Sequence, residues 1–67
     1  MKNLIKVERA RHNITQAELA DKVKVSRQTI NSIETGKFIP STLLALKIAD
    51  VLQTSVDEVF KLEDSDW

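Results

Sequence analysis

Residues 15–36, TQAELADKVKVSRQTINSIETG, decide the fold of this chain. The segment contains two short helical patterns, and each begins at a hydroxyl residue suited to cap a helix, Thr15 and Ser26. Thr15 and Glu18 also have the spacing of a capping box. A short turn separates the two patterns, and Gly36, the only glycine, ends the second. The segment therefore predicts two consecutive helices joined by a tight turn.

The second of these helices is predicted to separate its polar and apolar residues onto opposite faces. At about 100° per residue, Ile30 and Ile33 share one face. The opposite arc carries four polar residues, Arg27, Gln28, Asn31 and Ser32. The forked polar groups of arginine and glutamine match the major-groove edges of guanine and adenine. We therefore predict that this face reads DNA, although an ordinary solvated face is the alternative. For Arg27, a phosphate contact is as well supported as a base contact.

Three more helices are expected around this pair, over residues 3–11, 42–52 and 55–60. The segment TLLALKIADVL, residues 42–52, is apolar nearly all round and is predicted to be the central buried helix. Ser55 and Glu58 have the spacing of a second capping box. No strand is expected.

A chain of 67 residues has room for one domain. The predicted fold class is all-α, a compact five-helix bundle that contains a helix-turn-helix motif. We place this domain at residues 1–62 and an acidic C-terminal tail, which has no periodicity, at residues 63–67.

The net charge is zero, but the charges are unevenly distributed. Residues 1–47 hold nine Lys and Arg against four Asp and Glu, a net charge of +5. Residues 48–67 hold one Lys against six Asp and Glu, a net charge of −5. This asymmetry indicates a polarised molecule whose basic end faces phosphate. An acidic tail that only improves solubility is the alternative.

Several classes of function have no support in the sequence. There is no cysteine, His12 is the only histidine, and no glycine-rich loop or zinc-ligand spacing is present. We therefore predict no enzyme activity, no metal and no cofactor. The longest apolar run, residues 43–46, is far shorter than the ~20 residues of a membrane span, and the N-terminus does not resemble a signal peptide. We expect a cytoplasmic protein with no membrane partner.

Residues 3–62 resemble the lambda-repressor/Cro-like (xenobiotic-response-element type) family of helix-turn-helix regulators, in particular its small single-domain members. The resemblance is carried by ITQAELADKV, VSRQTINSIETGKF, PSTLLALKIADVL and SVDEVF. It implies a sequence-specific DNA-binding transcriptional regulator that acts as a repressor and binds a palindromic operator as a homodimer. Double-stranded DNA and a second copy of the chain are the implied partners.

The resemblance also implies roles for individual residues. It places Arg27, Gln28 and Ser32, together with Asn31, at base edges. The positions that it places at phosphates are Gln16, Ser26, Thr35 and Lys37, with Arg9 beside the DNA backbone. Arg9 and Glu34 match a family ion pair between the first and third helices, although both side chains being solvated is the alternative.

Lys24 departs from the family, which usually has glycine at this turn position. A side chain in the left-handed conformation costs roughly 1–2 kcal/mol, and we hypothesise that a phosphate contact from Lys24 compensates in part. Glu8 stands where relatives often have leucine.

A two-fold contact is predicted away from the DNA, formed by Val59, Phe60, Leu62 and Trp67. Small relatives sometimes add a short terminal strand to this contact. Trp67 either docks on the second subunit or is disordered, and the sequence does not decide between these. Phe38 is expected to pack in the core and not against DNA.

Two other functions remain open from the sequence. The first keeps the fold: an antitoxin that neutralises a partner protein and represses its own operon, or the controller of a restriction-modification operon. The second is a protein-interaction module that does not bind DNA.

Overall fold

The computed structural model describes all residues, 1–67, and measures 32 × 21 × 19 Å. The five helices are α1 (Ile5–His12), α2 (Gln16–Val23), α3 (Arg27–Glu34), α4 (Thr42–Val51) and α5 (Val56–Val59). Two short strands, β1 (Lys2–Asn3) and β2 (Phe60–Lys61), and a 3-10 turn (Asp64–Asp66) complete the chain. The expected five-helix domain is confirmed. None of its helices has the length and apolar character needed to cross a lipid bilayer.

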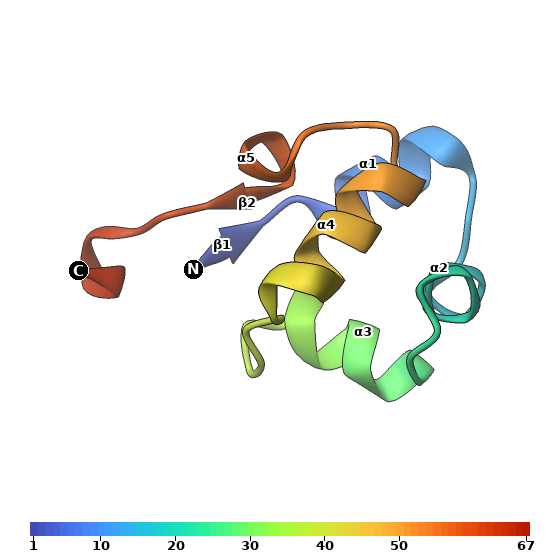
Figure 1. Cartoon of the computed structure of the whole chain (residues 1–67), viewed down its shortest axis with the longest axis horizontal. Coiled ribbons are helices and arrows are strands. Elements are labelled where there is room, and N and C mark those ends of the chain that lie inside the picture. Colours follow the sequence, from blue (N-terminus) through green and yellow to red (C-terminus); the bar gives the residue numbers. More distant parts are fainter.

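The expectation that the chain has no strand is wrong, because the two ends of the domain pair. β1 and β2 are antiparallel, with Lys2 opposite Lys61 and Asn3 opposite Phe60. The amide of Leu4 extends this contact by donating to the carbonyl oxygen of Val59 at 2.7 Å. Figure 1 shows the strands side by side, with both chain ends on the opposite side of the molecule from α2. Strands of two residues carry no detectable periodicity.

The caps of α2 and α3 form as the sequence predicts. The Oγ1 atom of Thr15 accepts from the amide of Glu18 at 3.0 Å, and Glu18 Oε1 accepts from the amide of Thr15 at 2.9 Å. The Oγ atom of Ser26 accepts from the amide of Thr29 at 3.1 Å. Between the helices, Lys24 has a φ of 63°, so the expected left-handed turn carries a lysine side chain.

Gly36 ends α3 in the left-handed conformation, with a φ of 81°. Its amide donates to the carbonyl oxygen of Ile33 at 3.1 Å, and the amide of Lys37 donates to that of Ser32 at 2.9 Å. These two bonds make a Schellman motif, which satisfies carbonyl groups at the end of the helix. A residue with a Cβ atom is disfavoured at such a φ, which explains why the only glycine stands here.

α4 is buried on one face only, which corrects the prediction of a helix covered all round. Leu44, Ile48 and Ala49 are buried, whereas Leu43 and Leu46 are 66% and 54% exposed. An apolar surface on every side of a helix predicts burial, but it does not say which side the rest of the chain covers.

The predicted capping box at the start of α5 does not form. Ser55 is the N-cap, but its side chain makes no cap hydrogen bond. A hydrogen bond from Ser55 instead lowers the pKa of the Asp57 carboxyl. The helix itself has only 4 residues.

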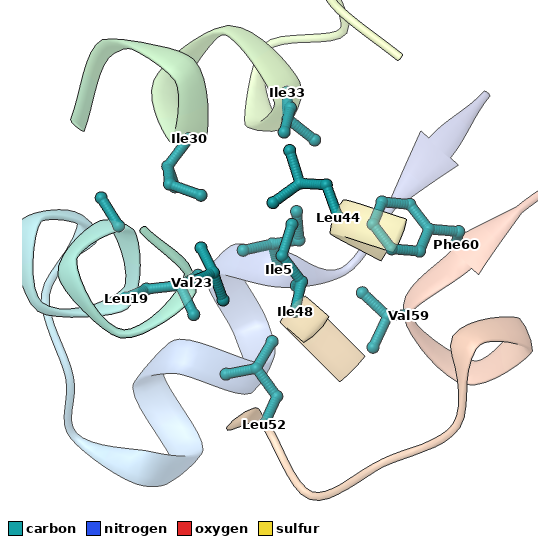
Figure 2. Close-up of a cluster of buried hydrophobic side chains, with 11 residues drawn as sticks. Ile5, Leu19, Val23, Ile30, Ile33, Leu44, Ile48, Leu52, Val59 and Phe60 are labelled. Carbon is teal, nitrogen blue, oxygen red and sulfur yellow. The ribbon is translucent and has the colours of Figure 1, made fainter. Parts of the chain in front are cut away.

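The core lies between the helices and holds α3 by its inner face (Figure 2). It contains 11 buried residues: Ile5, Leu19, Ala20, Val23, Ile30, Ile33, Leu44, Ile48, Leu52, Val59 and Phe60. α1 contributes only Ile5, and this helix begins later than the predicted residue 3. Asn3 precedes it and donates through Nδ2 to the carbonyl oxygen of Ile33 at 2.9 Å. The first strand is thereby tied to the end of α3.

The five tail residues are exposed but have local structure, which the sequence did not indicate. The α-amino group of Met1 lies 2.9 Å from Asp66 Oδ1 and 3.3 Å from Glu63 Oε1. Asp66 Oδ2 also accepts from the amide of Glu63 at 2.7 Å, which closes the 3-10 turn. These contacts lower the pKa of Asp66 and raise that of the α-amino group.

Candidate nucleic-acid interface

The outer face of α3 is exposed, and the only side-chain hydrogen bond that reaches it from another helix comes from Gln16. Ile30 and Ile33 on the inner face are 0% and 2% exposed and hold the helix to the core. Arg27, Gln28 and Asn31 are exposed on the other side. Figure 1 shows α3 at an edge of the molecule, with its N-terminal end away from the β1–β2 pair. The helix therefore presents a polar surface on a rigid support.

A shallow hollow lies over the centre of this outer face and has no hydrophobic residue in its lining. Its lining residues are Gln16, Arg27, Gln28, Asn31 and Ser32. The structure thus brings together the four residues predicted to contact bases and adds Gln16 from the first turn of α2.

Two further hollows flank the central one. The first runs along the ends of α1 and α2 and includes Arg9, Gln16 and Arg27. The second includes Ser26 and Lys37. Four of the residues predicted to contact phosphate therefore border the predicted base-reading surface. Arg9 and Gln16 lie on one side of it, and Ser26 and Lys37 lie on the other.

Lys24 and Thr35 were also predicted to contact phosphate, but they line none of these three hollows. Lys24 is exposed in the turn between α2 and α3. The hydroxyl of Thr35 donates to the carbonyl oxygen of Asn31 at 2.9 Å, so it is used at the end of its own helix.

Arg9 and Glu34, the two members of the predicted ion pair, meet through two hydrogen bonds. Arg9 Nε donates to Glu34 Oε2 at 2.8 Å, and Nη2 donates to Oε1 at 3.1 Å. A third bond runs from Arg9 Nη1 to the carbonyl oxygen of Ile14 at 3.1 Å. The side chains of Arg9 and Glu34 are only 14% and 8% exposed. This pair fixes α1 and the loop after it to the end of α3.

Gln16 connects this ion pair to the exposed face of α3, a link that sequence reasoning missed. Its Nε2 atom donates to Glu34 Oε1 and to Asn31 Oδ1, both at 3.2 Å. Helix periodicity groups residues within one helix, so it gave no signal for a contact between α2 and α3.

The capping box at the start of α2 also shifts the pKa of a carboxyl group near the interface. Hydrogen bonds from the backbone and side chain of Thr15 hold the pKa of the Glu18 carboxyl below its ordinary value. The ionised carboxylate is therefore the form that closes the capping box.

No group of His, Cys, Asp or Glu is placed to hold a metal ion.

Two expectations about aromatic and apolar residues need correction. Phe38 was expected in the core, but it is 47% exposed and lines the same hollow as Ser26 and Lys37. Val59 and Phe60 were expected in a two-fold contact, but they are 0% and 7% exposed and belong to the chain's own core. Both side chains pack against core residues of the other helices, a tertiary contact that the sequence pattern of α5 did not reveal.

An exposed apolar surface lies elsewhere, at the start of α4. A hollow there is lined by eight residues, of which six are hydrophobic. The eight are Met1, Ile39, Pro40, Thr42, Ala45, Leu46, Val56 and Phe60. Two of the lining residues, Ile39 and Leu46, are more than half exposed, and so is Leu43, which lies three residues before Leu46 on α4. Sequence reasoning missed this surface because it assigned all of α4 to the core.

Comparison with known proteins agrees with this geometry. Residues 5–59 match the family model described as Helix-turn-helix (HTH_3). An uncharacterized HTH-type transcriptional regulator of Methanocaldococcus jannaschii is 50% identical over 66 residues, which cover 98% of this chain and 100% of that protein. The HTH-type transcriptional regulator YgzD of Bacillus subtilis is 45% identical over 64 residues, with coverage of 96% and 97%.

A solved structure of the P22 c2 repressor in complex with a synthetic operator has a similar fold, with a TM-score of 0.80 and 32% identity. The similarity covers 85% of this chain and 86% of that one. Both the sequence match and the fold extend through the motif formed by α2 and α3. This chain therefore belongs to the lambda-repressor-like helix-turn-helix family of DNA-binding transcriptional regulators.

Proposed function

We propose that this regulator is a repressor that binds a palindromic operator as a homodimer and blocks a promoter by occupying it. The observation that carries the proposal is the polar hollow over α3, bordered on both sides by cationic and hydroxyl side chains. The P22 c2 repressor, which shares the fold, is solved on operator DNA. A protein that acts in this way works in the cytoplasm, where the DNA is.

In this proposal, α3 enters the major groove and its exposed residues contact base edges. Arg27 pairs with guanine and Gln28 with adenine, because their donors and acceptors match those bases. Asn31 and Ser32 extend the contact along the helix. Each good bidentate pair discriminates against a wrong base by about 1–3 kcal/mol.

Phosphate contacts fix the register of the protein on the duplex without reading the sequence. Ser26 and Lys37 hold the backbone on one side of α3, and Arg9 with the N-terminal end of α2 holds it on the other. Gln16 takes part through its backbone amide at the start of α2, because its side-chain nitrogen already donates to α3. We also assign phosphate contacts to Lys24 and Thr35, at the edge of the footprint.

A single recognition helix reads only a few base pairs, so useful specificity calls for two copies with half-sites about 34–36 Å apart. The apolar surface around Ile39, Leu43 and Leu46 suits the contact with the second copy. It contains both a hollow and exposed apolar side chains, which is what a self-complementary two-fold interface needs. In the proposed dimer, both recognition helices lie on the same side, so that they can enter the same face of the duplex.

Leu62 and Trp67 are 65% and 93% exposed and lie beyond β2. We place them at the edge of the same two-fold contact. The acidic tail that carries Trp67 stays away from the DNA, because Figure 1 places the C-terminus far from α2 and α3.

Binding to the DNA upstream of the gene that encodes this chain, measured at two salt concentrations, tests the proposal. We expect a protected palindromic site and an affinity that falls steeply with salt, since Lys and Arg displace counterions from phosphates. Size exclusion at micromolar concentration is expected to give a dimer. Absence of salt-dependent binding to any duplex would favour a protein-interaction module, and co-purification with a toxin-like protein would favour an antitoxin.

A further inference from the structure

The C-terminal tail is anchored to a residue that lines the apolar hollow at the start of α4, but its tryptophan does not enter that hollow. Met1 is one of the lining residues. Its α-amino group lies 2.9 Å from Oδ1 of Asp66, the residue directly before Trp67. Trp67 is nevertheless 93% exposed, and Figure 1 shows the tail extending outward from the helices. The only tryptophan of the chain is therefore held in solvent by a residue of an apolar hollow.

The tail has a defined conformation in the single chain. Asp66 Oδ2 accepts from the amide of Glu63 at 2.7 Å, and the amide of Trp67 donates to the carbonyl oxygen of Asp64 at 3.3 Å. Glu63 Oε1 also lies 3.3 Å from the α-amino group of Met1. A segment that is already ordered loses less conformational entropy when it binds than a flexible one does. The tail is therefore preorganised to present Trp67 to another molecule.

The hollow suits an indole ring in size and chemistry. Its volume is about 280 Å³, and six of its eight lining residues are hydrophobic. An apolar cavity of about 150 Å³ is large enough to bind benzene, so the hollow has room for the larger ring of tryptophan. A buried indole N–H usually finds a hydrogen-bond acceptor, and Thr42 supplies a hydroxyl in the lining. Leu46, which is 54% exposed, is an apolar contact for the ring.

The charges beside the hollow favour an acidic occupant. Lys2 and Lys61 are exposed and lie opposite each other in the β1–β2 pair, where like charges are destabilising. Neither lysine forms a salt bridge within the chain, and neither does Asp64 in the tail. The lysines directly follow Met1 and Phe60, which line the hollow. An acidic tail that enters the hollow of another copy therefore brings carboxylates close to both lysines.

We infer that the tail of each copy crosses to the other copy in the homodimer and buries Trp67 in the apolar hollow there. The inference rests on the proposed homodimer and names the occupant of its hollow. The contact is reciprocal, because each copy supplies one tryptophan and one hollow, as a two-fold interface requires. Tryptophan is among the residues that contribute most often to the centre of an interface. Dimerisation thus depends on a residue far from the recognition helix.

The fluorescence of the unmodified protein tests the inference directly, since the chain has one tryptophan and no tyrosine. Emission is recorded over a dilution series, and analytical ultracentrifugation gives the oligomeric state at each concentration. We expect the emission of a solvent-exposed tryptophan in the monomer and a shift to shorter wavelength as the dimer forms.

Three results of this experiment would contradict the inference. A dimer whose tryptophan still emits as in water would overturn it and leave the proposed function standing. A shifted emission in the monomer would also overturn it, because each tail would then fill the hollow of its own chain. A chain that stays monomeric at every concentration, with and without operator DNA, would overturn the proposed homodimer and the inference with it.

Two variants remove the two sides of the contact. Trp67→Ala removes the ring, and Leu46→Glu places a charge in the hollow. Both residues are exposed, so circular dichroism melting is expected to show intact folds. Each variant alone is expected to dimerise about 100-fold more weakly or worse, because both copies of a central contact are lost. Trp67→Phe is expected to retain most of the affinity. Val7→Ala, at an exposed apolar residue on α1, is the matched control and is expected to change nothing.

Mixing Trp67→Ala with Leu46→Glu tests whether the tails cross between copies. In the mixed dimer, the unaltered tail of one copy meets the unaltered hollow of the other, so one of the two contacts is intact. We expect the mixed dimer to form about tenfold more tightly than either variant alone, since it loses one central contact and not two. A mixed dimer of intermediate affinity would mean that Trp67 and Leu46 act independently, and this result would overturn the inference.

Discussion

Replacing Arg9 with alanine is expected to destabilise the fold by about 3 kcal/mol, at the lower end of the 3–5 kcal/mol found when one partner of a buried ion pair is removed. The substitution removes three hydrogen bonds and leaves the Glu34 carboxylate, whose side chain is 8% exposed, with Gln16 as its remaining partner. The lower end applies because Gln16 still donates to one carboxylate oxygen. A domain of this size has a total stability of roughly 3–10 kcal/mol, so the loss is a large fraction of it.

Urea denaturation followed by circular dichroism measures this loss, and Arg11→Ala is the matched control. Arg11 lies on the same helix as Arg9, and its replacement removes the same charge. Its side chain is 71% exposed, however, and its contact with Glu8 measures 3.5 Å. Because the arginine of this pair is exposed and the contact is long, the pair contributes ~0.5 kcal/mol or less. If Arg9→Ala costs no more than Arg11→Ala, the ion pair does not hold α1 to α3 and the reasoning is refuted.

A double-mutant cycle separates the lost attraction from the cost of an unpaired charge. Arg9→Ala combined with Glu34→Gln is expected to be more stable than Arg9→Ala alone, since no uncompensated charge then remains in the partly buried site. Strict additivity of the two substitutions would argue that the two side chains act independently.

Three further outcomes are expected. Lys24→Gly relieves the left-handed strain at a φ of 63° and raises the melting temperature; a lower melting temperature would mean that the lysine makes a contact that outweighs the strain. Leu43→Asp weakens self-association at least tenfold in analytical ultracentrifugation, whereas Val7→Asp, 48% exposed on α1, does not; equal effects would place the two-fold contact elsewhere. Because hydrogen bonds from Thr15 lower the folded-state pKa of Glu18, its stabilising effect is present above the unfolded-state pKa and is lost as pH falls through the folded-state value. Glu18→Gln removes this part of the acid dependence, and unchanged acid unfolding in the variant would contradict the role of the cap.

Local rules were sufficient to predict the part of the fold that carries the interface. The caps at Thr15 and Ser26, the end of α3 at Gly36 and the burial of Ile30 and Ile33 all depend on residues close together in the sequence. The outward position of the polar residues of α3 follows from helix geometry once its inner face is known.

Features that depend on distant segments were not predictable in the same way. Val59 and Phe60 are buried because they pack against core residues from helices that are distant in the sequence. The exposure of Leu43 depends on which side of α4 the other helices cover, and an apolar pattern on all sides does not specify this. The orientation of the Gln16 amide depends on a carboxylate from a different helix. Each of these is a tertiary contact with no periodic signal.

The most direct test of DNA reading by α3 compares Gln28→Ala with Lys37→Ala on operator and random duplexes across a range of salt concentrations. We predict that Gln28→Ala lowers operator affinity by about 1–3 kcal/mol, with little change on random DNA. Lys37→Ala is predicted to weaken binding to both duplexes alike and to reduce the salt slope by about one. Equal losses on operator and random DNA for Gln28→Ala would contradict the account.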